Sequence, residues 1–289
     1  MKKSGLFAIF LIVLQSVLYG LGDPISKTAF DTMPLFKLLT LRYTIALIVM
    51  FAIWGKRIIA GFRACSWRDW IIPVLCMGGA YVSNNVALLM TQATTVAFIR
   101  SLPTIIAPVL AWLVLRRHYK RKLIPVQAIV VVGLYMLCCG RGGLGDGFGA
   151  GEGFALLAAV LLAGSLVCGE QSLEKVDPIT LSALQTAASA IMAAIGMLAS
   201  NETQTTATTP IVWAIILYLA ILCTIAGYVL QNIALKSIRA HTVAVVQCLT
   251  PVMTAVFSYF ILGEHMSTFG LIGAGMILCC LILAVKLDD

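Results

Sequence analysis

The chain has 289 residues, of which 61% are hydrophobic and 11% are charged, whereas about a quarter of the residues in a soluble protein are charged. This balance excludes an ordinary soluble fold. The formal net charge of +8 does not indicate nucleic-acid binding, because the basic residues form short clusters between apolar runs, with no basic groove laced with aromatic residues. A membrane topology explains these clusters better.

Apolar runs follow one another along the whole chain, and about 20 such residues in a helix cross the hydrocarbon. The first run begins after four residues and lacks a cleavage site followed by a soluble domain, so we predict a retained helix rather than a signal peptide. The sequence predicts an all-α integral membrane fold with ten transmembrane helices, at residues 5–29, 34–54, 70–91, 94–115, 123–140, 149–171, 178–199, 210–235, 240–262 and 267–286.

The distribution of lysine and arginine predicts the orientation, because cytoplasmic loops carry the excess of positive charge. With the N-terminus inside, 15 of the 20 basic residues fall on the cytoplasmic side. Only Lys27, Lys37 and Arg141 fall outside, and Arg42 and Arg100 lie within the membrane. Both termini are then cytoplasmic in a multi-pass protein of the plasma membrane, which would be the inner membrane in a bacterium.

An internal repeat accompanies this pattern. Laying Tyr81 on Tyr228, an offset of 147 residues, aligns the third and fourth predicted helices with the eighth and ninth without a gap. Because five helices precede each counterpart, the second copy enters the membrane in the opposite sense, as in many secondary transporters. We therefore predict two inverted five-helix repeats, residues 1–140 and 141–289. The identities include Asn85/Asn232, Ala87/Ala234, Thr95/Thr242, Leu102/Leu249 and His118/His265.

Four short motifs are informative: Tyr19-Gly20 followed by Pro24 and Lys27, Leu41-Arg42-Tyr43, the stretch from Ala97 to Pro108, and Thr250-Pro251 leading to Leu262-Gly263-Glu264. Together they resemble the drug/metabolite transporter superfamily, and specifically its EamA-like ten-helix branch. Arg116-Arg117 departs from the family, which often has a Gly-Glu pair there. The resemblance covers the whole chain and implies a 5+5 topology, alternating access and no nucleotide hydrolysis. It does not name the substrate.

Three charged residues are predicted at bilayer depth, where ionisable groups are costly and are functional candidates by default. Asp23, Arg42 and Arg100 each lie about six to eight residues from the outer end of a predicted helix, or roughly 9–12 Å below the outer surface at about 1.5 Å per residue. They are therefore expected in one layer. Arg100, with Arg42, is a candidate to bind a carboxylate, since a guanidinium holds both oxygens. Alternatively, Arg100 snorkels to the headgroups.

Asp23 shares a helical face with Tyr19, and Pro24 beside it is expected to kink the helix. In the functional interpretation, Asp23 binds a substrate ammonium group or carries a coupling proton. In the structural interpretation, it neutralises Lys27 or Arg42. Further substrate-binding candidates are Tyr81, Asn84, Asn85, Tyr228, Gln231 and Gln247, although amides and phenols equally hold helices together by hydrogen bonds.

These patterns favour a secondary transporter for a small carboxylate-bearing or zwitterionic metabolite similar to an amino acid. The direction we predict is export. A transporter of cationic or drug-like compounds that uses Asp23 as the counter-charge is one alternative, and a scaffold subunit without transport activity is another. An enzyme is not expected, because the chain has no His-Glu-x-x-His, no Gly-x-Ser-x-Gly and no paired intramembrane aspartates.

The expected partners are the small-molecule substrate, the lipid bilayer and, as one option, a second copy of the chain in a homodimer. Nucleic acid is not expected as a partner. The nine cysteines form no Cys-x-x-Cys pair and no zinc-type spacing with histidine, so neither a metal nor a cofactor is expected.

The topology predicts which positions are accessible to a membrane-impermeant thiol reagent in a cysteine-free background. Single cysteines at Gly145 and Asn201 should react in intact cells, because both lie in predicted outer loops. A cysteine at Lys120 should react only after permeabilisation, because it lies in the most basic predicted loop. Labelling of position 120 in intact cells would contradict both the orientation and the inverted repeat.

Overall fold

A computed structural model describes residues 3–91, 93–116, 124–139, 149–202, 209–263 and 268–287. Within these ranges all regular structure is helical and there is no strand. The elements are α1 (Lys3–Phe30), α2 (Leu35–Ala64), the short η1 (Trp67–Asp69), α3 (Ile71–Met90), α4 (Ala93–Arg100), α5 (Pro103–Leu115), α6 (Ile124–Cys139), α7 (Ala150–Ser172), α8 (Pro178–Ala199), α9 (Pro210–Tyr218), the π-helix η3 (Leu219–Ala226), α10 (Gly227–Leu235), α11 (Ala240–Gln247), α12 (Leu249–Leu262) and α13 (Thr268–Leu287).

Most of these helices have the length and composition of membrane spans. Within the described residues, eight segments qualify: α1, α2, α3, α4 with α5, α7, α8, α9 to α10, and α11 with α12. α6 has 16 residues, and α13 contributes the shorter apolar stretch Thr268–Cys279. The chain is therefore a multi-pass helical membrane protein, and ten crossings require α6 and α13 to cross as well.

Three predicted helices differ from the structure in ways that matter for the site. The second helix, predicted to end at residue 54, continues to Ala64 through a kink at Trp54, whose φ of −122° and ψ of 18° are not helical. The fourth is broken between Arg100 and Pro103, because Pro103 has no N–H to donate and begins a new helix at its first turn. The ninth is broken at Cys248, between α11 and α12.

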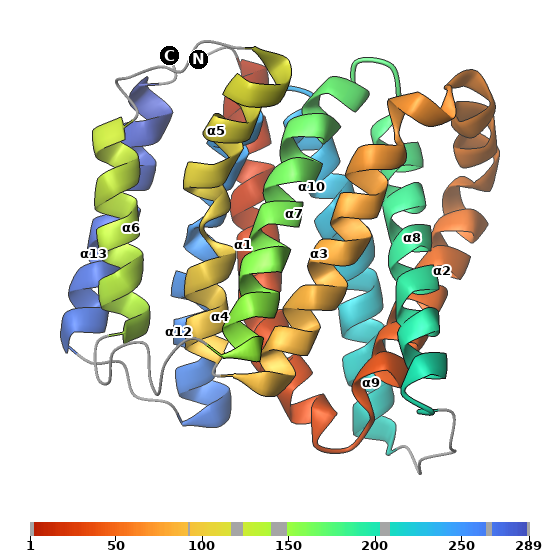
Figure 1. The fold of residues 1–289 in the computed structure, drawn as a ribbon, viewed down its shortest axis with the longest axis horizontal. Helices are drawn as coiled ribbons and strands as arrows, with labels where there is room; N and C mark the ends of the chain where they lie inside the picture. Colours follow the sequence, from red (N-terminus) through yellow and green to blue (C-terminus); the bar gives the residue numbers. More distant parts are fainter. Residues whose placement is uncertain are drawn as a thin grey trace.

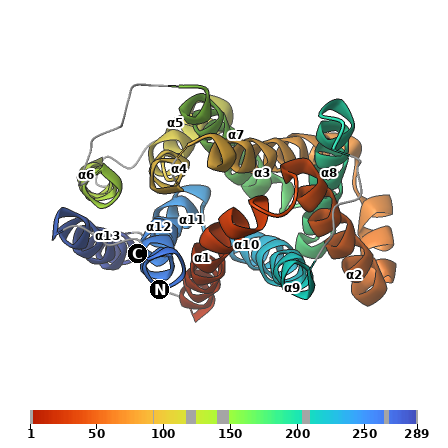
Figure 2. The same cartoon turned by 90° about the horizontal axis from the view of Figure 1, so that it is seen from below.

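The helices form a bundle whose arrangement is clear from two directions. α6 and α13 lie side by side at one edge, and α2 and α8 lie together at the opposite edge (Figures 1 and 2). α1 packs between them against α10 and α12, and α3 packs against α7. α1 begins and α13 ends at the same end of the bundle (Figure 1), as an even number of crossings requires.

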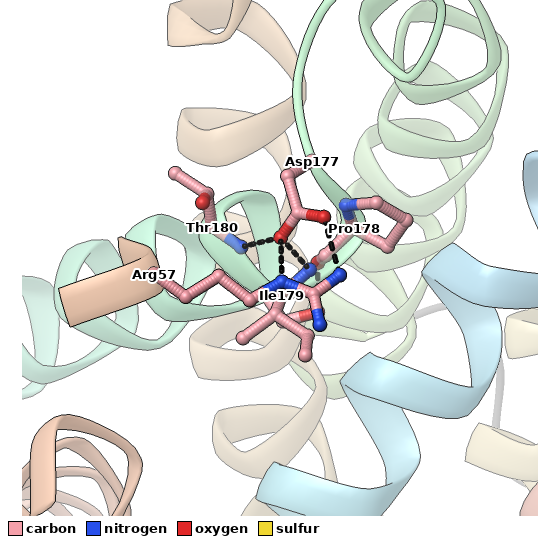
Figure 3. Close-up of polar contacts among 6 residues, drawn as sticks. Arg57, Asp177, Pro178, Ile179 and Thr180 are labelled. Atoms are coloured by element: carbon pink, nitrogen blue, oxygen red, sulfur yellow. Dashed lines mark hydrogen bonds and ion pairs between the residues drawn. The ribbon is translucent and has the colours of Figure 1, made fainter. Parts of the chain in front are cut away.

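Polar contacts hold α2 and α8 together at both ends. Asp177 caps the N-terminus of α8, where its carboxylate accepts the N–H groups of Ile179 and Thr180 at 3.1 and 3.2 Å and binds the Arg57 guanidinium of α2 at 2.7 Å (Figure 3). At the other end Glu202 accepts the N–H of Phe36 at 2.8 Å. Burial alone raises the pKa of Asp177, but Arg57 and the two N–H groups outweigh it and lower the pKa below its usual range.

A close approach between helices involves Gly20, where α1 crosses α12. A Cβ atom at this position would overlap the Cβ of Met253 and lie 2.9 Å from the main-chain nitrogen of Thr254. Gly20 and Asp23 are three residues apart and therefore share one face of α1. The missing side chain at Gly20 thus lets α12 come close enough for Thr254 to reach Asp23.

We predict that Gly20→Ala destabilises the folded protein by about 1–3 kcal/mol, the usual cost of overpacking, because the new methyl group meets main-chain atoms. Gly153→Ala is the matched control, since a Cβ there meets no atom within 4 Å, and alanine suits a helix better than glycine. Thermal unfolding in detergent measures both. Equal stability of Gly20→Ala and Gly153→Ala would contradict the close α1–α12 contact.

Candidate functional site

A small polar cavity lies where α1, α2, α3, α4 and η3 meet. Its volume is about 20 Å³, which is room for about one water molecule. Gly22, Ser26, Leu219 and Cys223 form part of its lining. The rest of the lining consists of seven of the ten substrate-binding residues predicted from the sequence, namely Tyr19, Asp23, Arg42, Tyr81, Asn84, Asn85 and Arg100. We call this space the central cavity.

An ion pair between Asp23 and Arg100 crosses the central cavity. Arg100 Nη1 donates to Asp23 Oδ1 at 3.1 Å and Nη2 donates to Oδ2 at 2.7 Å, so the guanidinium holds both carboxylate oxygens. Each side chain is only 13% exposed. The Thr254 hydroxyl of α12 donates to Asp23 Oδ2 at 3.1 Å. The carboxylate therefore joins α1 to α4 and to α12.

Two structural expectations about these charges are wrong. Neither Lys27 nor Arg42 is the ion-pair partner of Asp23. The carboxylate of Asp23 points instead at Arg100, at the C-terminal end of α4. Nor does Arg100 extend toward the headgroups. Its side chain is turned inward onto Asp23, since α4 ends at Arg100 and the chain turns through Ser101 and Leu102 before α5 begins.

Arg42 lines the same cavity and is held from α2 by the π-helix. Its Nε donates to Thr224 Oγ1 at 2.9 Å, and the Thr224 hydroxyl in turn donates to the Leu219 carbonyl at 3.0 Å. Arg42 is 4% exposed. The wider turn of a π-helix, which is frequent at functional sites, places Thr224 toward Arg42. Two residues of the cavity wall, Leu219 and Cys223, come from this same segment.

Three tyrosine rings pack against one another at the central cavity, at tilted or edge-on angles. The ring centroids of Tyr19 and Tyr81 are 5.9 Å apart, and those of Tyr81 and Tyr228 are 5.2 Å apart. Tyr81 and Tyr228 are the residues that the sequence repeat superposes. Tyr228 is fully buried behind Tyr81 and does not line the central cavity.

The amides predicted from the second half of the sequence do not line the central cavity. Gln247 lines a second cavity of about 30 Å³, which shares Tyr19, Tyr81 and Arg100 with the central one. Its amide donates to Gln231 Oε1 at 2.8 Å and to Gln15 Oε1 at 3.0 Å. The three glutamines thus join α1, α10 and α11, and at Gln231 the amide holds helices together, as the structural alternative expects.

A larger cavity of about 300 Å³ lies at the end of the bundle where α7 and α10 finish, lined by Glu170, Glu174, Lys236 and Arg239 among others. Glu170 Oε2 accepts the N–H of Ala240, the first residue of α11, at 2.9 Å. The carboxylate therefore caps a helix as well as lining this cavity.

Sequence reasoning missed some residues that the geometry brings to the site. Thr254 and Thr224 are single threonines within apolar helices, and nothing in their spacing distinguishes them from packing residues. Cys223 is a buried cysteine in an apolar run, and it also lines the central cavity. Only the polar face of the first helix gave a usable signal, because Gly22 and Ser26 share it with Asp23.

A bundle of membrane-length helices around a charged, buried cavity is typical of membrane transporters. The EamA-like transporter family matches residues 6–139 and again residues 149–286, so the chain belongs to the EamA-like transporter family and is a membrane transporter.

Individual relatives agree with this assignment. An uncharacterized transporter of Archaeoglobus fulgidus is 24% identical over 278 residues, covering 96% of this chain and 85% of the relative. A second uncharacterized transporter of that organism is 32% identical over 123 residues, or 43% of each chain. A solved crystal structure of a protein with 17% identity superposes with a TM-score of 0.79 over 100% of both chains, which shows that the two share a fold.

Proposed function

We propose that this protein is a secondary transporter that exports a small carboxylate-bearing or zwitterionic metabolite by alternating access. The observation that supports this proposal most is the two-point ion pair between Arg100 and Asp23 inside the central cavity. A guanidinium in this position binds a carboxylate by both oxygens. In this structure the carboxylate bound to Arg100 is that of Asp23.

The proposed mechanism is an exchange of carboxylates on Arg100. The central cavity of about 20 Å³ is too small for a metabolite, so it must open before cargo enters. The cargo carboxylate then replaces Asp23 on Arg100. Since Thr254 of α12 also holds Asp23, releasing this carboxylate loosens a tie between α4 and α12. Cargo binding is thereby coupled to movement between the two halves.

The proposed topology has ten crossings in two inverted five-helix repeats, with both termini cytoplasmic. Three observations support it. The family matches each half of the chain separately. α2 packs on α8 and α6 packs on α13, which are counterpart pairs in the repeat. The two helix breaks, after Arg100 and after Gln247, are also 147 residues apart. Broken helices often form the substrate sites of such transporters.

The cationic-cargo alternative is less well supported. Both kinds of cargo would have to break the ion pair between Asp23 and Arg100. The central cavity is lined by two arginines, Arg42 and Arg100, and by one aspartate, Asp23, so its charge favours a carboxylate over a cation.

We predict that Arg100→Ala and Arg100→Lys both abolish uptake of carboxylate cargo into proteoliposomes, tested with a panel of radiolabelled amino acids and monocarboxylates. Lysine should fail because an ammonium group is a point charge and does not present the planar fork that binds both oxygens. Arg63→Lys, an exposed arginine near the end of α2, is the control and should transport normally. Wild-type uptake by Arg100→Lys would show that only the charge matters.

We further predict a separate outcome for Asp23→Asn, which keeps the shape of the side chain but cannot take up a proton. If Asp23 carries a coupling proton, the variant should lose accumulation driven by a pH gradient and keep cargo exchange between equal concentrations. Because the competing carboxylate is gone, it should bind carboxylate cargo at least as tightly as the wild type. Unchanged gradient-driven accumulation in Asp23→Asn would contradict the coupling role.

A further inference from the structure

Asn84 is an amide of the central cavity whose oxygen has no hydrogen-bond partner among the described residues. It lies on α3, lines the cavity together with Arg100, and is only 4% exposed. Its Oδ1 atom is buried and accepts no hydrogen bond within the part of the chain that the structure describes. A buried acceptor without a partner destabilises the folded state, so native proteins rarely keep one without a reason.

Neighbouring asparagines use their amide N–H groups inside the protein, although Asn232 Oδ1 is also a buried acceptor without a partner among the described residues. Asn85, the next residue, donates to the carbonyl of Tyr81 at 2.7 Å. Asn232, its counterpart in the sequence repeat, donates to Ser182 Oγ at 2.9 Å and to Gln185 Oε1 at 2.8 Å. These amides connect or cap helices. Of these three asparagines, Asn84 is the one that both has an unpaired oxygen among the described residues and lines the central cavity.

The shared lining of the cavity limits which ligand group this acceptor meets. Because Asn84 and Arg100 line the same small space, a cargo group bound to Asn84 is expected close to the carboxylate bound to Arg100 once the cavity has opened. The partner of an amide oxygen must be a hydrogen-bond donor. A substituent on the carbon next to the carboxylate, either an ammonium or a hydroxyl group, fits both conditions.

We infer that Asn84 Oδ1 binds the α-ammonium or α-hydroxyl group of the cargo while Arg100 binds its carboxylate, so that the transporter selects α-amino or α-hydroxy acids over simple carboxylates. This inference rests on the proposed function. Asn84 is a specificity-determining residue in this assignment. A site built to bond a donor rejects the analogue that lacks it, because the protein group is then left unpaired.

Matched ligand pairs test this inference on the purified full-length protein. The pairs are alanine and propanoate, leucine and 4-methylpentanoate, and phenylalanine and 3-phenylpropanoate, with the 2-hydroxy acids as a third member. Wild type should bind the α-substituted acid of at least one set roughly ten- to hundredfold more tightly than the unsubstituted acid, the usual effect of a hydrogen bond to a charged group. Asn84→Leu and Asn84→Ala should remove this preference and bind the unsubstituted acid as wild type does.

A stability measurement separates ligand recognition from a structural role. Asn84 Oδ1 has no hydrogen-bond partner among the described residues. Replacing it should therefore cost no hydrogen bond, and Asn84→Leu should melt at the same temperature as wild type or higher. Asn232→Leu is the matched control and should melt lower, because it removes the donor to Ser182 and Gln185.

The possible results distinguish the two proposals. If the Asn84 variants keep the preference, or if wild type binds both acids of each pair equally, the role of Asn84 is overturned and carboxylate transport stands. If no acid of any set binds, the proposed function fails, and the inference fails with it.

Discussion

The ion pair between Asp23 and Arg100, which lies inside the helix bundle, determines how the neighbouring helices must be arranged. Taking two charges out of water costs more than their attraction returns unless the geometry is close and further hydrogen bonds complete it. Asp23 and Arg100 meet this requirement with two parallel hydrogen bonds and a third from Thr254. Each bond depends on a feature of the backbone: the end of α4 at Arg100, and the glycine at position 20 that lets α12 approach α1.

Three irregular parts of the backbone lie near this pair. The break between α4 and α5 turns Arg100 inward, the break after Gln247 ends α11 beside the second cavity, and the π-helix η3 brings Thr224 to Arg42. Regular helices satisfy their own main-chain groups and position side chains at fixed intervals. Departures from that regularity in a membrane are tolerated where they line a cavity, which is where they are found in this protein.

Much of the fold follows from the sequence because one physical requirement, about 20 apolar residues per crossing, dominates it. The predicted runs correspond to the observed helices, and the depths of Asp23, Arg42 and Arg100 suggested that these charges meet. The sequence did not predict which charges pair. Pairing depends on the rotation of each helix about its axis and on the turn after Arg100, and apolar helices carry little information about either.

The helix breaks were missed for a related reason. Pro103 and Pro251 are visible in the sequence, but proline is tolerated within transmembrane helices, so its presence does not by itself predict a break. Thr254 has no distinguishing spacing, and the unpaired acceptor of Asn84 is a property of its surroundings rather than of its residue type. Such features become visible only once the neighbouring helices are placed.

Infrared difference spectroscopy tests the exchange of carboxylates on Arg100 most directly. Addition of a transported carboxylate to the wild-type protein should change the absorption of one protein carboxyl group, because Asp23 leaves its guanidinium partner when the cargo takes its place. Isotope-labelled cargo separates the ligand bands from those of the protein. The protein signal should be absent in Asp23→Asn, although that variant still binds the cargo. Saturating cargo that leaves the Asp23 signal unchanged would show that the ion pair stays closed and that the cargo binds elsewhere.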